Sequence, residues 1–435
     1  MIRRVPRPPS QRSPARGSVP GLLRTAALAC LLIVPAAARA QSITIDSFAT
    51  GQATQTLTFP PAGSTTSASV SGAGILGGER DVEVNLAGGV TAGNGISAGV
   101  AGGLFSHSQD ATITGTSQLV WDGADGAAAV NPTGLGGIDL TAAGVQDAFL
   151  LNVVSSDLTF TLTIEVWSDA GNASSMTLKV PGPIVSPTGI YIPYSLLTTA
   201  LGTGADFTHV GAVAFTLGST TSSPHLVLGP LQTAATLTST KTVALDNDVN
   251  GDGQANPGDT LLYTVVITHH DSGLVTEIHG HAPALGVTFA SGTPAYTTLV
   301  NGSVTSDQGS VTLGNNTGDT SVAVAVPILA NNNTATLQFA VTVNDPLPPG
   351  VTQVVCQGTV SSNTLTNALT DDPSLPGMSD PTVFPVFPLP VAVPTLDEWG
   401  LLALTSLLAA LGLTRLRRRR IGTEPLPSLD ARRRL

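Results

Sequence analysis

Short runs of alternating apolar and polar residues recur along most of this chain. In LTFTLTIEVW (158–167), Phe160, Leu162 and Ile164 point to one side and the intervening threonines to the other. Because the side chains of a strand alternate between its two faces, this pattern predicts a half-buried antiparallel strand. Further strands are predicted in AVAFTL (212–217), HLVLGPL (225–231), LLYTVVIT (261–268), SVAVAVPIL (321–329) and ATLQFAVTV (335–343). Amphipathic helical periodicity is almost absent, so we predict an all-β fold with one helical turn near IPYS (192–195).

The character of the sequence changes at two points after the amino-terminal segment. Residues 41–236 are rich in Thr, Ser, Gly, Ala and Val and are long enough for one β-sandwich. Residues 237–380 begin a second set of strand-like runs. Residues 381–394 contain five prolines, which predict a stiff, extended spacer. We therefore expect two tandem β-sandwiches followed by a spacer.

Both ends of the chain carry membrane signals. Residues 1–40 are predicted to be a signal peptide, with Arg24 before an apolar run and a small-x-small cleavage site before Gln41. Residues 393–420 combine a short motif, an apolar span and four consecutive arginines. The uncharged run 399–413 is slightly shorter than the roughly 17–25 residues that span a bilayer, and the arginines should hold its far end in the cytoplasm. A transmembrane helix is expected there, with 421–435 as a cytoplasmic tail. The alternative, a buried soluble helix, is disfavoured because it would end in four arginines.

The order VPTL-x-x-WG, apolar helix and arginines closely resembles the IPTL carboxy-terminal sorting signal of Gram-negative bacteria. This resemblance implies export, insertion into the inner membrane and cleavage by a sorting protease. Family members usually end just after the basic cluster, whereas fifteen residues follow it here. The predicted sorting residues are Val393, Pro394, Thr395, Leu396, Trp399 and Gly400.

The charge of the exported region is strongly one-sided. Between residues 41 and 400 there are 27 acidic residues and three basic ones, Arg80, Lys179 and Lys241, which gives a net charge of −24. Such a surface repels nucleic acid and anionic lipid, and it favours cations. Cys356 is the one cysteine that remains after removal of the signal peptide, so no internal disulfide can form. Stability must come from core burial, together with any bound metal.

Each predicted sandwich also resembles a known type of domain. The phrases ILGGERDVEV, LVWDGADG and GADFTHVGAV are similar to those of a domain common in bacterial exported proteins with carboxy-terminal anchors, and their order resembles galactose-binding-like jelly rolls, many of which bind carbohydrate. Both ends of the second unit resemble the bacterial conserved-repeat domain, domain of unknown function eleven, which is an immunoglobulin-like sandwich. That resemblance implies a stalk or spacer role and no enzymatic activity.

The segment DVNGDGQANPGD (248–259) has the spacing of a twelve-residue calcium loop. Oxygen-bearing side chains occupy alternating positions, and Gly253 falls at position 6, where a sharp turn is required. The loop resembles that of dockerins more than a full EF-hand, because a strand follows it. The alternative is an Asx-rich turn without metal. The predicted calcium ligands are Asp248, Asn250, Asp252, Gln254, Asn256 and Asp259.

Three other features admit both a functional and a structural interpretation. GISAG (95–99) matches a nucleophile elbow around Ser97, but no helix follows, so catalysis is disfavoured. Arg80 could bind a sugar or carboxylate ligand, although pairing with an internal carboxylate is favoured. Trp121 with Asp122 and Asp125 could form a sugar platform beside polar groups or a cation. The favoured interpretation is a core tryptophan followed by a turn.

Four histidines, His269, His270, His279 and His281, lie close together in the sequence. Strand alternation would place His279 and His281 on one face with Glu277, an arrangement compatible with zinc. Solvated loop histidines are the favoured interpretation, because no cysteine or second carboxylate completes a ligand set.

Together these features predict an exported, envelope-anchored surface protein that is not an enzyme and has a structural, adhesive or matrix role. Its expected partners are the membrane and a sorting protease, with a surface glycan as a further candidate, and not nucleic acid. The alternative is a secreted protein that binds or cleaves carbohydrate through the first sandwich. A glycosidase would need two carboxyl groups facing each other across a cleft. An aromatic-lined groove, or glycan binding by residues 41–236, would favour that alternative.

Overall fold

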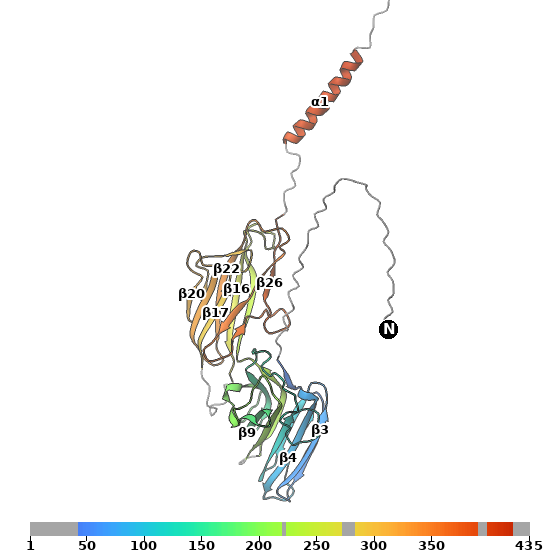
Figure 1. The fold of residues 1–435 in the computed structure, drawn as a ribbon, viewed down its shortest axis with the longest axis vertical. Coiled ribbons are helices and arrows are strands. Elements are labelled where there is room, and N and C mark those ends of the chain that lie inside the picture. Colours follow the sequence, from blue (N-terminus) through green and yellow to red (C-terminus); the bar gives the residue numbers. More distant parts are fainter. Residues whose placement is uncertain (1–41, 220–222, 272–282, 390–397, 421–435) are drawn as a thin grey trace, which may run out of the picture. The chain divides into compact units, whose positions relative to one another are not determined.

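The computed structural model describes residues 42–219, 223–271, 283–389 and 398–420 (Figure 1). Antiparallel strands in several sheets dominate these residues, and one long helix, α1 (Glu398–Arg420), follows them. The predicted all-β class with a single carboxy-terminal helix is thus confirmed. Some predictions lie outside the described residues: the signal peptide (1–40), His279 and His281, Val393 to Leu396 in the sorting motif, and the tail (421–435).

The first sandwich contains two seven-stranded sheets. One has the order β11-β8-β14-β6-β5-β2, with β1 also paired to β14. Its strands are β1 (Thr44–Asp46), β2 (Gln52–Thr58), β5 (Gly95–Ala101), β6 (Leu104–Gln109), β8 (Ala148–Ser156), β11 (Thr188–Pro193) and β14 (His225–Ala234). The other has the order β12-β10-β9-β13-β7-β4-β3. Its strands are β3 (Ser64–Ser71), β4 (Glu79–Gly89), β7 (Ile113–Trp121), β9 (Phe160–Asp169), β10 (Asn172–Val180), β12 (Thr198–Leu201) and β13 (Ala212–Ser219).

Apolar residues from both sheets form the core of this sandwich. Phe215 on β13 makes edge-to-face contacts with Trp121 on β7 and with Phe149 on β8, each with ring centroids 5.6 Å apart. All three rings are fully buried, and burying each contributes on the order of 1.5–3 kcal/mol. The predicted alternation is confirmed in β9, where Phe160, Leu162 and Ile164 are buried and the threonines between them are partly exposed.

The second sandwich contains two five-stranded sheets and a two-stranded ribbon. The first sheet has the order β15-β16-β22-β18, with β19 also on β22, and the second has the order β20-β21-β17-β24-β25. The strands of the first are β15 (Leu237–Asn247), β16 (Thr260–His269), β18 (Thr297–Leu299), β19 (Thr305–Ser306) and β22 (Thr334–Val343). Those of the second are β17 (Ala284–Gly292), β20 (Ser310–Leu313), β21 (Ser321–Leu329), β24 (Gly358–Ser361) and β25 (Ala368–Leu369). Its core is separate from that of the first sandwich and centres on Tyr263, Phe289 and Phe339.

The proline-rich stretch differs from its prediction. Residues 382–385 form strand β26 (Thr382–Pro385), which pairs with β23 (Gln353–Cys356), and Val386 is buried in the second core. The expected spacer therefore does not begin at residue 381. A two-stranded ribbon has open edges, so it accommodates prolines that cannot donate a backbone hydrogen bond.

The predicted helical turn and the other predicted strands are found at the expected positions. The 3-10 turn η2 (Tyr194–Leu196) lies at the predicted helical turn. Another 3-10 turn, η1 (Leu76–Gly78), precedes β4. The other predicted strand runs fall within β13, β14, β16, β21 and β22. Their burial alternates along the strands of the second sandwich, as in β16.

Candidate functional site

Arg80 lies inside the first sandwich, where it forms a buried ion pair with Asp46. Its Nη1 is 2.9 Å from Asp46 Oδ2, and both side chains are fully buried. Arg80 Nε also donates to Gln52, and Trp121 Nε1 donates to Asp46 at 3.0 Å. The structural interpretation of Arg80 and the core position of Trp121 are both confirmed, so Trp121 offers no surface on which a sugar could stack.

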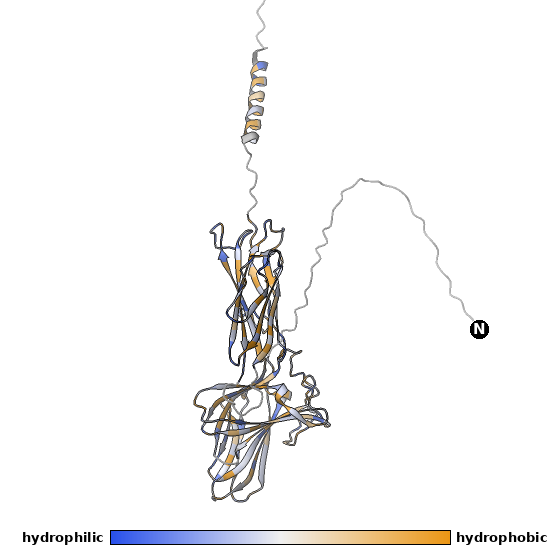
Figure 2. Cartoon of the chain, turned by 90° about the vertical axis from the view of Figure 1, so that its left-hand side faces the viewer, coloured by the Kyte–Doolittle hydropathy of each residue, from blue (hydrophilic) through white to orange (hydrophobic). Residues whose placement is uncertain are grey.

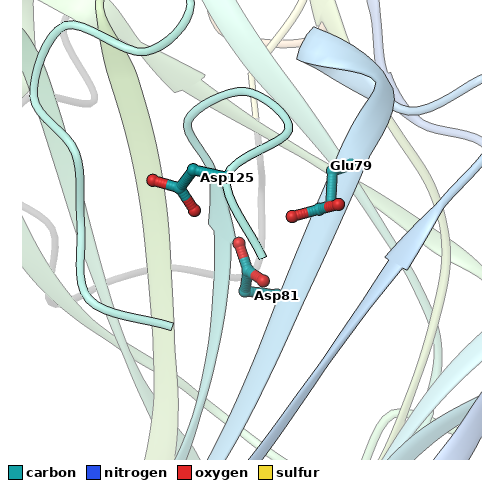
Figure 3. A group of neighbouring side chains, drawn as sticks. All are labelled: Glu79, Asp81 and Asp125. Atoms are coloured by element: carbon teal, nitrogen blue, oxygen red, sulfur yellow. The ribbon is translucent and has the colours of Figure 1, made fainter. Parts of the chain in front are cut away.

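The neighbours of Arg80 in the sequence point away from this ion pair. In β4, residues 80, 82, 84 and 86 are buried in the core, whereas Glu79 and Asp81 occupy the opposite face because strand side chains alternate. Asp81 pairs with Val120 near the end of β7, so the loop after β7 lies beside it. Figure 3 shows that the carboxyl groups of Glu79, Asp81 and Asp125 converge there. One oxygen of each lies within 4.8 Å of the others.

Asp81 is the most unusual member of this acidic cluster (Glu79, Asp81 and Asp125). Its side chain is 1 % exposed, and neither carboxyl oxygen makes a hydrogen bond of normal geometry. Burial raises the pKa of Asp81 to about 7, and the nearby charges of Asp122, Glu79 and Asp125 add to that rise. The Ser69 hydroxyl, across the β3–β4 ladder, acts in the opposite direction. Two ionised carboxylates at this spacing repel by roughly 3 kcal/mol at an effective dielectric of 20.

The loop that carries Asp125 is fixed at several points. Gly126 N donates to Glu79 Oε1 at 2.6 Å, and the carboxylate of the buried Asp122 accepts from Asn131 N at 2.6 Å. A Cβ at Gly134 would lie 1.6 Å from the Asp122 carbonyl oxygen, so glycine alone fits this close approach. These contacts hold the 122–126 loop against β4.

The predicted calcium loop begins after β15 and ends at β16, in the second sandwich. Asp248 accepts hydrogen bonds from the backbone N–H groups of Gly251 and Gly253, both at 2.7 Å. Asp259 is buried and accepts from Val249 N and Asn256 N. The loop thus gathers the predicted residues into one turn, and bonds to backbone N–H groups lower the pKa of Asp248. Calcium binding there stays a prediction.

The nucleophile-elbow geometry is not formed at Ser97. This residue lies within β5, where it pairs with Thr56 and Ser108 on the neighbouring strands. A strand–turn–helix corner is required for an elbow, so the pattern carries no catalytic geometry here.

Of the four clustered histidines, the structure describes two. His269 ends β16 and is buried, which corrects the interpretation of this residue as a solvated loop histidine. His270 Nε2 lies 2.9 Å from Thr238 Oγ1. Burial lowers the pKa of both rings, so both are neutral at pH 7.

A shallow groove of about 250 Å³ crosses the outer face of the sheet that contains β4, β7, β9 and β13. Five threonines line it together with Asn85, Ala87 and two glycines. No aromatic side chain is among its lining residues. This groove therefore differs from the aromatic-lined groove that the carbohydrate alternative predicted.

Helix α1 is long and apolar enough to cross a membrane. The segment Gly400–Arg417 has 18 residues and a mean hydropathy of 1.3, and none of it is buried by protein. Its leucines are 49–65 % exposed, and Figure 2 shows the apolar character of the helix. Among the described residues no protein surface buries this helix, so the alternative of a buried soluble helix finds no support there.

Comparison with known proteins places this helix within a recognised signal. The IPTL-CTERM motif matches residues 391–420, so the predicted sorting signal is confirmed. The match covers the tail alone; it indicates an exported protein anchored at the cell surface, with a carboxy-terminal apolar helix. No curated protein matches the chain.

Solved structures resemble the chain only distantly. The N-terminal domain of the Streptococcus gordonii adhesin Sgo0707 is 11 % identical, with 80 % of this chain and 83 % of that chain covered and a TM-score of 0.27. A putative membrane-anchored protein from Corynebacterium diphtheriae is 11 % identical, with 82 % and 91 % covered and a TM-score of 0.24. A family 11 carbohydrate-binding module from Clostridium thermocellum is 13 % identical, with 43 % and 97 % covered and a TM-score of 0.21. Scores this low support no conclusion about function, and the jelly-roll and conserved-repeat resemblances stay predictions.

Proposed function

We propose that this protein is an envelope-anchored surface protein of a Gram-negative bacterium with a structural, adhesive or matrix role. The observation that carries the proposal is the IPTL-CTERM motif, which coincides with an apolar helix that no other part of the described chain covers. A bilayer is the environment that removes such a helix from water. Two β-sandwiches precede it and form the exported part.

The sorting signal directs the chain into the inner membrane, where a sorting protease recognises residues 393–396 and cleaves before the helix. The arginines at 417–420 hold the far end of the helix in the cytoplasm until cleavage. In this order of events the same signal first anchors the chain in the inner membrane and is then the substrate of the sorting protease.

The test is a comparison of the full chain with a chain truncated after residue 390. Intact cells expressing each form are labelled with an antibody against the first sandwich, and the envelope and culture medium are assayed separately. We expect surface labelling of the full chain and loss of the truncated chain to the medium. Adhesion or matrix formation should fall with the labelling. Equal surface retention of the truncated chain would contradict the proposal.

The carbohydrate alternative makes a different prediction for the first sandwich. A threonine-lined groove can offer hydroxyl groups to a sugar, but it lacks the stacking surface that aromatic rings supply. A glycan array probed with the full chain distinguishes the two: binding of a defined glycan would favour the alternative, and no binding favours the structural role.

A second part of the proposal concerns the loop 248–259, which we propose binds calcium. Its support is the spacing of oxygen ligands and the glycine at position 6, together with the half-buried Asp248 and the exposed Asp252 on one short turn. Calcium there would stabilise the second sandwich by binding the folded state alone.

A further inference from the structure

The first sandwich contains an acidic cluster that the sorting signal and the calcium loop do not involve. Glu79 and Asp81 lie two residues apart on one face of β4, and Asp125 reaches them from the loop after β7 (Figure 3). Of the three, Glu79 and Asp81 are buried and Asp125 is exposed. The cluster is therefore open to solvent on the side of Asp125 alone.

No basic side chain compensates this cluster among the described residues. The exported region has three basic residues, and Arg80 and Lys241 are each fully buried in the core of one sandwich. Arg80, although it stands between Glu79 and Asp81 in the sequence, faces the opposite side of β4 and pairs with Asp46. Lys179 occupies an exposed position on β10. In the sheet, β10 is separated from β4 by three strands, β9, β13 and β7.

Asp81 supplies the second observation. Its side chain is 99 % buried and points into the cluster, and neither of its carboxyl oxygens makes a hydrogen bond of normal geometry, although the nearby Ser69 hydroxyl lowers its pKa. A buried polar group without a partner is costly, and buried carboxylates are normally paired with a cation or coordinated to a metal. A metal ion in the cluster would supply the partner that the Asp81 carboxylate lacks.

We propose that Glu79, Asp81 and Asp125 are ligands of a calcium ion. All three offer hard oxygen ligands, which suit calcium and magnesium rather than zinc. Two oxygens on opposite sides of a calcium ion lie about 4.6–5.2 Å apart, and on opposite sides of magnesium about 4.0–4.2 Å. The three oxygens lie within 4.8 Å of one another, which is compatible with the ligand shell of a calcium ion. Calcium also accepts an irregular ligand set that backbone carbonyls and water complete.

A bound ion would fasten the loop after β7 to the edge region of the sheet. Gly126 N already donates to Glu79 Oε1, and Asp125 Oδ1 accepts from Ala127 N. Calcium would replace the repulsion among the three carboxylates with a shared attraction. The amide groups of residues 123–127 should then exchange with solvent more slowly.

The experiment is hydrogen–deuterium exchange of the full chain, purified in detergent, with calcium chloride or with chelator. We expect calcium to slow exchange in the peptide covering 122–131, with half of the effect at about 0.1–1 mM, the range of extracellular calcium modules. In Asp125→Asn the midpoint should rise by at least about tenfold, because loss of even an outer-shell partner costs roughly 10–100-fold in metal affinity. Asp125 is exposed, so this variant should fold normally.

Two controls make the result specific. Asp169→Asn makes the same change at another exposed carboxylate that accepts from a backbone N–H two residues on, and it should leave the calcium response intact. Asp248→Ala removes the other calcium candidate and should leave exchange in 122–131 unaffected.

The repulsion among the three carboxylates predicts a second effect, on the melting temperature. In chelator, Asp125→Asn should melt at or above the wild-type temperature because it removes repulsion, whereas in calcium it should melt below the wild type. No calcium effect on peptide 122–131 at about 10 mM, an equal effect in Asp125→Asn, or equal protection by magnesium would each overturn the assignment.

Discussion

The most direct perturbation of the proposed anchor is a single charge at the centre of α1. Leu408 lies near the middle of Gly400–Arg417, and its side chain is 59 % exposed. At 1.5 Å per residue the 18-residue segment is about 27 Å long, close to the roughly 30 Å of a bilayer core. Leu408→Arg would therefore place a guanidinium near the bilayer centre.

The magnitude follows from the residues of the helix. Its eight leucines each favour insertion by about 0.3–0.6 kcal/mol, which amounts to roughly 2–5 kcal/mol together. A central arginine costs about 2.5–3.5 kcal/mol and also removes one leucine, so the change is about 3–4 kcal/mol. That change nearly cancels the leucine contribution and lowers the insertion equilibrium by on the order of 100- to 1,000-fold.

The assay is alkaline extraction of membranes from a host that lacks the sorting protease, so that α1 stays attached to the chain, which is detected by an antibody against the first sandwich. Wild type should stay in the membrane pellet, and Leu408→Arg should appear in the soluble fraction. Leu416→Arg is the matched control. It adds the same charge beside Arg415 and Arg417, where the side chain can reach the interface, and it should behave as wild type. Equal retention of Leu408→Arg and wild type would refute the membrane role of α1.

Three further predictions concern the sandwiches. Calcium should raise the melting temperature of the second sandwich, and Asp248→Ala should abolish that shift; an unchanged shift in the variant, or none in the wild type, would reject the loop as a calcium site. Arg80→Leu should lower the free energy of unfolding of the first sandwich by about 3–5 kcal/mol in urea titrations, because it leaves Asp46 buried and unpaired, and a loss below about 1 kcal/mol would contradict this. Burial lowers the pKa of His107 to about 4, so the unfolded chain binds more protons than the folded chain between pH 4 and 6.5, and stability should fall by up to about 3 kcal/mol as the pH drops through that window. In His107→Gln the free energy of unfolding should depend less on pH in this window. An equally steep pH dependence in the variant would show that other groups, and not His107, cause it.

Alternation of apolar and polar residues was sufficient to predict the fold class and six of the longer strands, β9, β13, β14, β16, β21 and β22. In β9 the predicted faces match the burial pattern residue by residue, because neighbouring strands on both sides leave that strand few other ways to bury Phe160 and Ile164. The terminal helix was equally predictable, since a long apolar run followed by arginines has few stable environments. The beginning of the proline-rich stretch was harder to predict, because its pairing with β23 depends on a strand about thirty residues earlier.

The acidic cluster is the feature that could not be predicted from the sequence. The period of two that places Glu79 and Asp81 on one face is visible in ERDVEV, and Asp125 was already a candidate beside a cation. What joins them is the pairing of β4 with β7, which lie about thirty residues apart in the chain. Long-range strand order is not encoded in local alternation, so the three carboxylates could not be brought together before the fold was known.

The central claim is that the tail acts as a sorting signal that is cut. Mass spectrometry of the protein isolated from the final envelope fraction of its native host, with complete mapping of its carboxy terminus, tests this directly. The account predicts a mature terminus upstream of Trp399 and no peptide from α1. Recovery of intact peptides through Leu435 in that fraction would contradict it.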